Sequence, residues 1–135
     1  MIKHVCTVTV RYAETDQMQF AHHSNYIVWF EHARIQLMNH YGISYAKLEQ
    51  DGFLMPVLEV NARFIKYAVF DETLKIETSL PEIPGAKLRF LYNVYNTHEE
   101  LICNGSSLHA FINLDKKAIK PPKELLKILR PHYKA

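Results

Sequence analysis

The sequence lacks three features that are typical of exported, membrane or metal-bound proteins. It has only two cysteines, Cys6 and Cys103, which lie far apart and lack the spacing of zinc ligands or of a disulfide framework. No apolar run approaches the length that spans a membrane, and the first ten residues have no long apolar core and no small-residue cleavage site. We therefore expect an unexported, cytoplasmic protein that needs no metal and no cofactor.

An excess of charge of one sign is also missing. Sixteen Lys and Arg residues against 14 Asp and Glu residues give a formal charge of +2, which is too weak to indicate a nucleic-acid or membrane partner. Seven of the sixteen basic residues follow Asp115, but Tyr133 is the only aromatic residue among them that could stack on a base. We therefore expect no nucleic acid and no membrane among the partners.

The composition that is present is ordinary for a globular protein. Apolar residues make up 48% of the 135 residues and charged residues 22%. This length is close to the commonest size of one domain and is sufficient to bury one core. We therefore predict a single domain over residues 1–135.

Periodicity predicts one long helix after an initial strand. Residues 5–11 alternate in the manner of a strand rich in β-branched residues. A helical stripe follows, with Ser24 as its expected N-cap and Gly42 at its end. Its apolar residues recur at spacings of three and four: Tyr26, Phe30, Ala33, Leu37 and Tyr41. A short helical turn is expected over residues 44–50 and a terminal helix over 124–129.

Four further strands are predicted after the long helix, over residues 57–67, 73–80, 88–96 and 101–113. Gly105 lies inside the last of them and suggests a β-bulge. Consecutive strands with short turns pair as neighbours, so this order predicts an α+β fold in which an antiparallel five-stranded sheet is wrapped around one long helix. The sheet leaves apolar edges exposed, so we expect a homodimer or a homotetramer.

The loop before the helix has a chemical interpretation. An acid such as Asp16 at a helix N-terminus stands beside unpaired N–H groups that suit a developing oxyanion. The ordinary alternative is a turn or capping aspartate. His22 and His23 are adjacent and have no third ligand at metal-like spacing, while His32 and His40 are eight residues apart, so a metal site is not expected. Glu31 and Arg34 at i,i+3 predict a surface ion pair.

The same window resembles a known family. The run Tyr12-Ala13-Glu14-Thr15-Asp16, then His22-His23-Ser24-Asn25-Tyr26, Phe30-Glu31 and Ala33-Arg34, resembles the signature of the 4-hydroxybenzoyl-CoA thioesterase family. Members are hotdog-fold enzymes that hydrolyse acyl-CoA thioesters. The resemblance covers most of the chain, but its specificity lies in residues 11–34.

The resemblance implies a role for particular residues. Asp16 maps onto the catalytic carboxylate, which acts as nucleophile or general base, and His23 maps onto the histidine that donates a hydrogen bond or positions Asp16. Backbone N–H groups of Ser24, Asn25 and Tyr26 would meet the oxyanion of the acyl-CoA substrate. Basic side chains would line the path of the coenzyme A phosphates, with Lys66 favoured over the other candidates: Arg63, Lys116, Lys117 and Lys120.

The chain departs from the family pattern after Asp16. Many members have one or two glycines there, whereas this chain has Met18 and Gln19, so the loop shape does not use the conformational freedom of glycine. Met18 and Phe20 either line the acyl pocket or pack against the helix.

Two other functions remain open at this point. A hotdog dehydratase acting on acyl thioesters typically has a histidine before a Phe-Pro-Gly turn, which this sequence lacks. A non-catalytic protein that binds acyl-CoA, or nucleic acid through the basic end, is the second alternative. The sequence does not reveal the acyl group.

Overall fold

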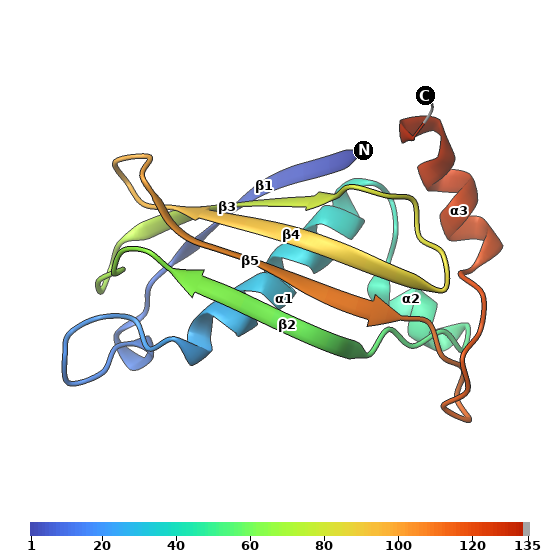
Figure 1. The fold of residues 1–135 in the computed structure, drawn as a ribbon, viewed down its shortest axis with the longest axis horizontal. Helices are drawn as coiled ribbons and strands as arrows, with labels where there is room; N and C mark the ends of the chain where they lie inside the picture. The colour runs from blue at the N-terminus through green and yellow to red at the C-terminus, as the bar shows by residue number, and fades with distance from the viewer. Residues whose placement is uncertain (134–135) are drawn as a thin grey trace.

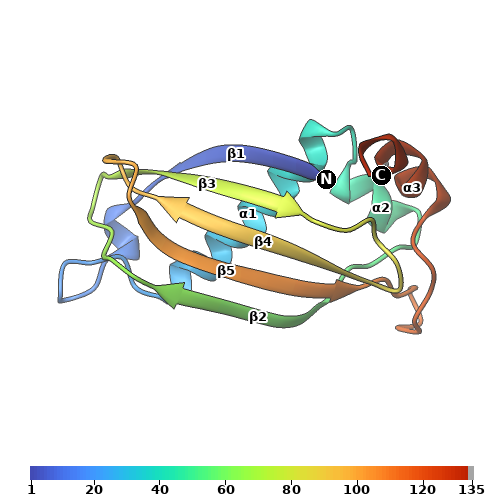
Figure 2. The same cartoon turned by 45° about the horizontal axis from the view of Figure 1, so that its top comes forward.

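The computed structural model describes residues 1–133 and contains a five-stranded antiparallel sheet wrapped around one long helix (Figure 1). The strands are β1 (Ile2–Thr9), β2 (Val57–Phe64), β3 (Thr73–Leu80), β4 (Lys87–Tyr95) and β5 (Leu101–Ala110). Their order in the sheet is β1-β3-β4-β5-β2, which Figure 2 shows from one edge to the other. The predicted α+β architecture is confirmed.

Helix α1 (Ser24–His40) covers one face of the sheet. Its residues Phe30, Ala33 and Leu37 are almost fully buried, because their spacing of three and four places them on the side that faces the strands. The ring of Phe30 stacks on that of Tyr92 in β4, with centroids 4.3 Å apart. The helix and the inner face of the sheet thus share one core.

The observed strand ends differ from the predicted ones. Strand β1 occupies residues 2–9 rather than 5–11 because it pairs with β3 along its whole length. Strands β2 and β5 end at Phe64 and Ala110, three residues earlier than predicted. The residues after Phe64 instead form the loop that leads to β3, whereas those after Ala110 form a loop at the opposite end of the sheet.

The predicted bulge at Gly105 is wrong. Gly105 stays in register with Ala62 and Tyr92, and the irregularities of the sheet lie elsewhere, at Val57/Glu59 and Val94/Tyr95. A Cβ atom on Gly105 would lie 2.8 Å from Cε2 of Phe30. It would collide still more closely with the backbone carbonyl oxygen of Asn61 in β2, so glycine stands here because both β2 and α1 approach it closely.

Two short helices lie at the end of the sheet where β5 ends (Figure 1). In α2 (Tyr45–Gln50) the side chain of Ser44 caps the first turn by accepting a hydrogen bond from the Lys47 amide. Helix α3 (Lys123–Leu129) buries Leu125 and Leu129 near the chain start, where the Met1 amino group donates to the His132 carbonyl oxygen at 2.9 Å. None of the helices within residues 1–133 is long and apolar enough to cross a membrane.

The predicted ion pair between Glu31 and Arg34 exists at 3.8 Å, but only Glu31 lies on the surface. The side chain of Arg34 is only 7% exposed, because it turns toward the core near Tyr92. Behind it, the Tyr92 hydroxyl bonds to Ser107 Oγ at 2.6 Å, and Ser107 bonds to His109 Nε2 at 2.8 Å. Burial, reinforced by the Arg34 charge, lowers the pKa of His109 to about 4.

Strand β2 forms an exposed apolar edge. Most of its side chains are open to solvent, whereas the neighbouring β5 alternates with buried residues. Four of the exposed side chains of β2 are large and apolar: Val57, Leu58, Val60 and Phe64. An unpaired apolar edge strand is a surface on which another chain can pair.

Candidate active site

The acidic loop folds into a small hairpin over residues 14–22, which precedes α1. In its stem the Glu14 carbonyl oxygen accepts a hydrogen bond from the His22 amide at 2.8 Å, and Thr15 pairs with Ala21. Near its tip the Asp16 amide donates to the Phe20 carbonyl oxygen at 3.1 Å. The stem thus fixes both strands of the hairpin and leaves Asp16 near the tip.

The hairpin is also attached to the segment that precedes β3. The Ala21 amide donates to the Ala68 carbonyl oxygen at 2.8 Å, and Phe20 pairs with Val69. Hairpin and segment lie at the same end of the sheet, where β2 ends and β3 begins (Figure 1). The site therefore combines residues that are about fifty positions apart in sequence.

Asp16 is partly exposed, and one carboxylate oxygen, Oδ1, accepts a hydrogen bond from the Met18 amide at 2.9 Å. This is the turn contact that the ordinary interpretation of Asp16 predicts. The second oxygen, Oδ2, has no hydrogen-bond donor among residues 1–133. Asp16 lines a cleft of about 530 Å³ together with Tyr12, Thr15, Met18, Gln19, Phe20, Val69 and Phe70.

The two alternatives for Met18 and Phe20 resolve differently. Met18 is 68% exposed and lines the cleft without being buried in the core. Phe20 also lines the cleft, but its ring stacks on Tyr67 with centroids 4.0 Å apart. The cleft beside Asp16 is therefore lined by an aromatic pair and a flexible thioether.

Gln19 takes over the conformation that glycine has in a turn. Its φ of +69° lies in the left-handed region, and its amide donates to the Asp16 carbonyl oxygen at 2.9 Å. A residue with a Cβ atom adopts this region at a cost of about 1–2 kcal/mol. The missing glycine therefore does not prevent a tight turn next to Asp16.

Ser24 is not the N-cap of α1 but its first residue, and the cap position is His23. The Ser24 side chain instead bonds to His22 Nδ1 at 2.8 Å. The predicted oxyanion amides also need correction, because all three already donate within the chain. Those of Ser24 and Asn25 donate to His22, and that of Tyr26 donates to the His23 carbonyl oxygen.

The amide of His23 differs from these three. It donates no hydrogen bond to any other residue between 1 and 133. It stands directly before the helix, where the partial positive charge of the backbone dipoles is concentrated. An available amide for an oxyanion is therefore present one residue earlier than predicted.

The side chains of Asn25 and Tyr26 serve the structure of the site. Asn25 Nδ2 donates to the carbonyl oxygens of Glu14 at 2.8 Å and His22 at 3.1 Å, so it ties the helix to the hairpin. Tyr26 is 2% exposed, and burial is the main cause that raises the pKa of Tyr26 to about 12. The amide nitrogen of Asn25 is therefore engaged within the chain, and Tyr26 is part of the buried core.

The two adjacent histidines lie on the surface with their rings 4.1 Å apart. His23 also approaches Phe64 of β2, with ring centroids 6.2 Å apart, but it forms no hydrogen bond with Asp16 in the described part of the chain. Residues 1–133 contain no group of three or more His, Cys, Asp or Glu side chains arranged to hold a metal ion.

The basic candidates separate into two groups. Lys66 follows β2 at the hairpin end of the sheet, where its ammonium forms an ion pair with the Glu100 carboxylate. Arg63 is exposed on β2 near the same end. The exposed residues Lys116, Lys117 and Lys120 follow β5 at the opposite end (Figure 1). Of these five candidates, only Arg63 and Lys66 are close to the hairpin end within one chain.

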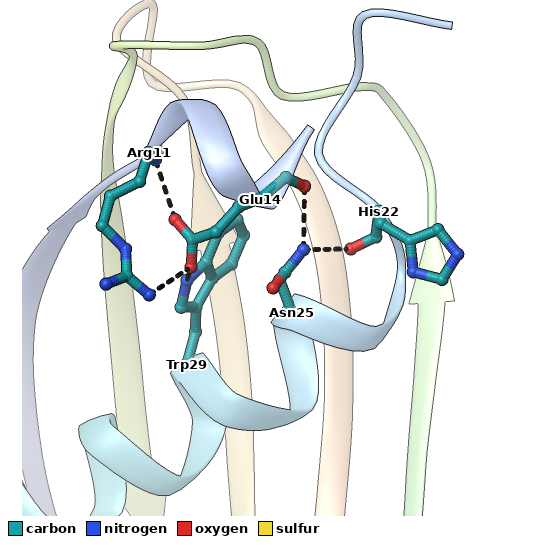
Figure 3. Close-up of polar contacts among 5 residues, drawn as sticks. All are labelled: Arg11, Glu14, His22, Asn25 and Trp29. Atoms are coloured by element: carbon teal, nitrogen blue, oxygen red, sulfur yellow. Dashed lines mark hydrogen bonds and ion pairs between the residues drawn. The ribbon is translucent and has the colours of Figure 1, made fainter. Parts of the chain in front are cut away.

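Glu14 is the residue of the site whose role sequence reasoning missed. It is 5% exposed, and its carboxylate accepts hydrogen bonds from the Arg11 amide at 2.8 Å and from Trp29 Nε1 at 2.9 Å (Figure 3). Burial alone would raise the pKa of Glu14, but these hydrogen bonds and the Arg11 guanidinium together hold it below its usual value. In the sequence it appeared only as a member of the family signature, two residues before Asp16, which indicated no role for it.

Comparison with known proteins identifies the family. Residues 10–129 match the model of the thioesterase-like superfamily. The chain is 38% identical over 114 residues to YneP of Bacillus subtilis, which carries a provisional acyl-CoA thioesterase assignment; the match covers 84% of this chain and 81% of YneP. The structure of DHNA-CoA thioesterase from Staphylococcus aureus superposes with a TM-score of 0.86 and 33% identity, over 89% of this chain and 81% of that one.

A more distant structure shows the same fold. A variant of 4-hydroxybenzoyl CoA thioesterase in complex with 4-hydroxybenzoyl CoA superposes with a TM-score of 0.85, at 18% identity, over 95% of this chain and 99% of that one. The predicted hotdog fold and the predicted class of enzyme, a thioester hydrolase, are confirmed. The chain belongs to the thioesterase-like superfamily.

Proposed function

We propose that this protein hydrolyses an acyl-CoA thioester to a free acid and coenzyme A, and that Asp16 makes or activates the nucleophile. The observation that carries this proposal is the carboxylate of Asp16, which lines an open cleft with one oxygen hydrogen-bonded and the other available. The relatives named above carry acyl-CoA thioesterase functions, and their similarity supports the substrate class.

The chemistry has two routes that this geometry serves equally. In the first, Asp16 attacks the thioester carbonyl carbon, the carbon–sulfur bond breaks, the thiolate leaves, and water then hydrolyses the mixed anhydride. In the second, Asp16 removes a proton from a water molecule that attacks the same carbon. In both routes the thioester is already activated, so a carboxylate and an oxyanion donor suffice.

The amide of His23 is the donor that we assign to the oxyanion. It is unpaired within residues 1–133 and precedes a helix of seventeen residues, so it offers a fixed hydrogen bond where negative charge develops. The exposed imidazole of His23 would donate a second hydrogen bond to the same carbonyl oxygen or orient the acyl group. Asn25 and Tyr26 act by holding this helix start in position.

Lys66 is the basic residue that we propose for the coenzyme phosphates. It lies at the hairpin end of the sheet and is half exposed. Its present partner is Glu100, so a phosphate would compete with one exposed carboxylate for the ammonium. The lysines after β5 would contribute only if a second subunit brought them to the site.

We further propose that the active form is a homodimer, or a homotetramer of two dimers, paired through β2. This strand has a free edge and exposed apolar side chains, and its end approaches His23 through Phe64. Sedimentation at micromolar concentration is expected to show no monomer. A stable and active monomer would contradict both the pairing and a site completed by a second subunit.

A panel of acyl-CoA substrates, followed by release of free thiol, tests the function. We expect thiol release from at least one short aliphatic, long aliphatic or aromatic acyl-CoA. A dehydratase would change the acyl group without releasing thiol, and a non-catalytic binding protein would shift its melting temperature with acyl-CoA but release none. Either result would replace the proposal. A cytoplasmic location stays a prediction, which fits two free cysteines.

A further inference from the structure

The stem of the hairpin contains a second acid, Glu14, that the proposed mechanism does not use. We infer that Glu14 is a positioning residue which, clamped by Trp29 and Asn25 of α1, fixes the relative placement of Asp16 and the His23 amide. The inference rests on the proposed function, since it assigns a role to Glu14 in that same site. We call Glu14, Trp29 and Asn25 the stem clamp.

Glu14 has several fixed contacts within the chain. The Glu14 carboxylate accepts from the Arg11 amide and from Trp29 Nε1, at 2.8 and 2.9 Å. Its carbonyl oxygen accepts from the His22 amide and from Asn25 Nδ2, both at 2.8 Å. Glu14 therefore connects the end of β1, the second strand of the hairpin and the helix.

Two side chains of α1 contact Glu14. Asn25 and Trp29 are four residues apart, so they project from the same face of α1, and Figure 3 shows both side chains directed at Glu14. Trp29 is 4% exposed, and its indole is a rigid donor that water does not replace. The carboxylate and the indole N–H thus form a buried hydrogen bond that keeps the hairpin against the first turns of α1.

The stem clamp adjoins the segments that carry the reacting groups, the Asp16 carboxylate and the His23 amide. Asp16 follows Glu14 by two residues, a chain length of at most about 7 Å. His23 follows the His22 amide that bonds to Glu14. The clamp thus connects the chain segments that carry the carboxylate and the oxyanion amide, and a displacement of about 1 Å between such groups costs up to about a hundredfold in rate.

Glu14 does not contact the cleft in which a substrate would bind. Glu14 is buried and bonded on all sides, and it is absent from the residues that line the cleft beside Asp16. A substrate in that cleft meets Asp16 but not Glu14. The residue therefore acts through Asp16 and α1 rather than on the reacting atoms.

The test compares Glu14→Gln, which keeps the shape but replaces one of the two acceptor oxygens with an NH2 group that faces the Arg11 amide or the indole, with Trp29→Phe, which keeps the ring but removes the donor. Each is expected to lower kcat by about 10- to 100-fold with KM within about threefold of wild type, because binding contacts remain while alignment is lost. The losses in the double variant should not multiply, because both variants act on the same hydrogen-bonded cluster. Glu82→Gln, an exposed acid on the β3–β4 loop, is the control for the same change of charge.

Two readouts are independent of activity. Trp29 is the only tryptophan of the chain, so its fluorescence emission is expected to change in Glu14→Gln and to stay unchanged in Glu82→Gln. Amide exchange at His22 is expected to accelerate by about tenfold or more in both clamp variants, because the hairpin stem opens locally. If Glu14→Gln does not fold, Trp29→Phe alone decides, by kcat and by amide exchange at His22.

The outcomes separate the two proposals. Wild-type kcat in folded Glu14→Gln and Trp29→Phe, with turnover lost in Asp16→Asn, would overturn the stem clamp alone. Losses that multiply in the double variant, or unchanged exchange at His22, would also overturn it. Wild-type turnover in Asp16→Asn would instead overturn the proposed role of Asp16, and the positioning role with it.

Discussion

Glu14 and Asp16 are two acids of one hairpin with opposite environments. Glu14, in the stem, is buried and its carboxylate is held by a backbone amide, an indole and a guanidinium. Asp16, near the tip, has one donor and lines an open cleft. The difference teaches that two residues of sequence separate an acid that fixes structure from one that is free to react. The number of available carboxylate oxygens, rather than the residue type, distinguishes the two.

The largest effect should come from removing the reactive acid. Asp16→Asn keeps the size and most hydrogen bonding of the side chain but removes the nucleophile or base. Turnover is expected to fall by about 10²–10⁴-fold, the range for loss of a positioned acid–base group. Acyl-CoA binding and the melting temperature should change little. Steady-state kinetics and thermal unfolding measure both, and near-wild-type turnover would mean that the tip is only a turn.

The next largest effect is on stability, where the loss should be greater at Glu14 than at Asp16. Glu14→Ala leaves the buried Trp29 indole N–H without an acceptor, which costs about 1–3 kcal/mol, and also removes the acceptor of the exposed Arg11. Asp16→Ala removes one partly exposed hydrogen bond and is expected to cost about 1 kcal/mol or less. Urea unfolding of the two variants gives the free energies. Equal losses in the free energy of unfolding would show that the side chains of Glu14 and Asp16 contribute equally to stability.

The response to acid sharpens the same comparison. The folded pKa of Glu14 lies below its ordinary value near 4.5, so the stability that its charge contributes is complete above that value and is lost as the pH falls through the folded pKa. Glu14→Gln should therefore unfold with a shallower pH dependence below about 4.5. Unfolding of both proteins from pH 7 to pH 3 measures the difference. Parallel curves over that range would mean that the Glu14 charge is not held by its donors.

His109 supplies an internal reference in that experiment. Its pKa is lowered from 6.5 to about 4, so its contribution is complete above pH 6.5 and is lost as the pH falls toward 4. This loss lies at higher pH than that of Glu14 and occurs equally in wild type and Glu14→Gln. Subtracting one curve from the other therefore removes it.

The smallest effect should arise from a cation near the hairpin. Lys66→Ala is expected to raise KM for acyl-CoA about two- to fivefold and to leave kcat nearly unchanged, because an exposed ion pair contributes at most about 1 kcal/mol. The paired change of Lys116 and Lys117 to alanine, at the far end of the sheet, is expected to have less effect. Kinetics against acyl-CoA concentration measures both. An unchanged KM in every variant would place the phosphate path elsewhere.

Much of the fold was predictable because it depends on short-range periodicity. Alternation identified the strands, and spacings of three and four identified α1 with its buried Phe30, Ala33 and Leu37. The predictions that failed depend on neighbours distant in sequence. Gly105 follows from the approach of the Asn61 carbonyl oxygen and of Phe30, and the burial of Arg34 from its turn toward Tyr92. A pattern along the chain contains no information on such contacts.

The sequence by itself determined the α+β fold and, through residues 11–34, the family and the candidate Asp16, because these depend on residue order and local spacing. Only the tertiary structure decided which acid is free and which amide is available. Glu14 is engaged because Trp29, fifteen residues later, reaches it, and the amides of Ser24 to Tyr26 are occupied because the first turn closes on His22 and His23. Hydrogen-bond donors in a folded chain are shared between segments, so their availability is a property of the assembled site.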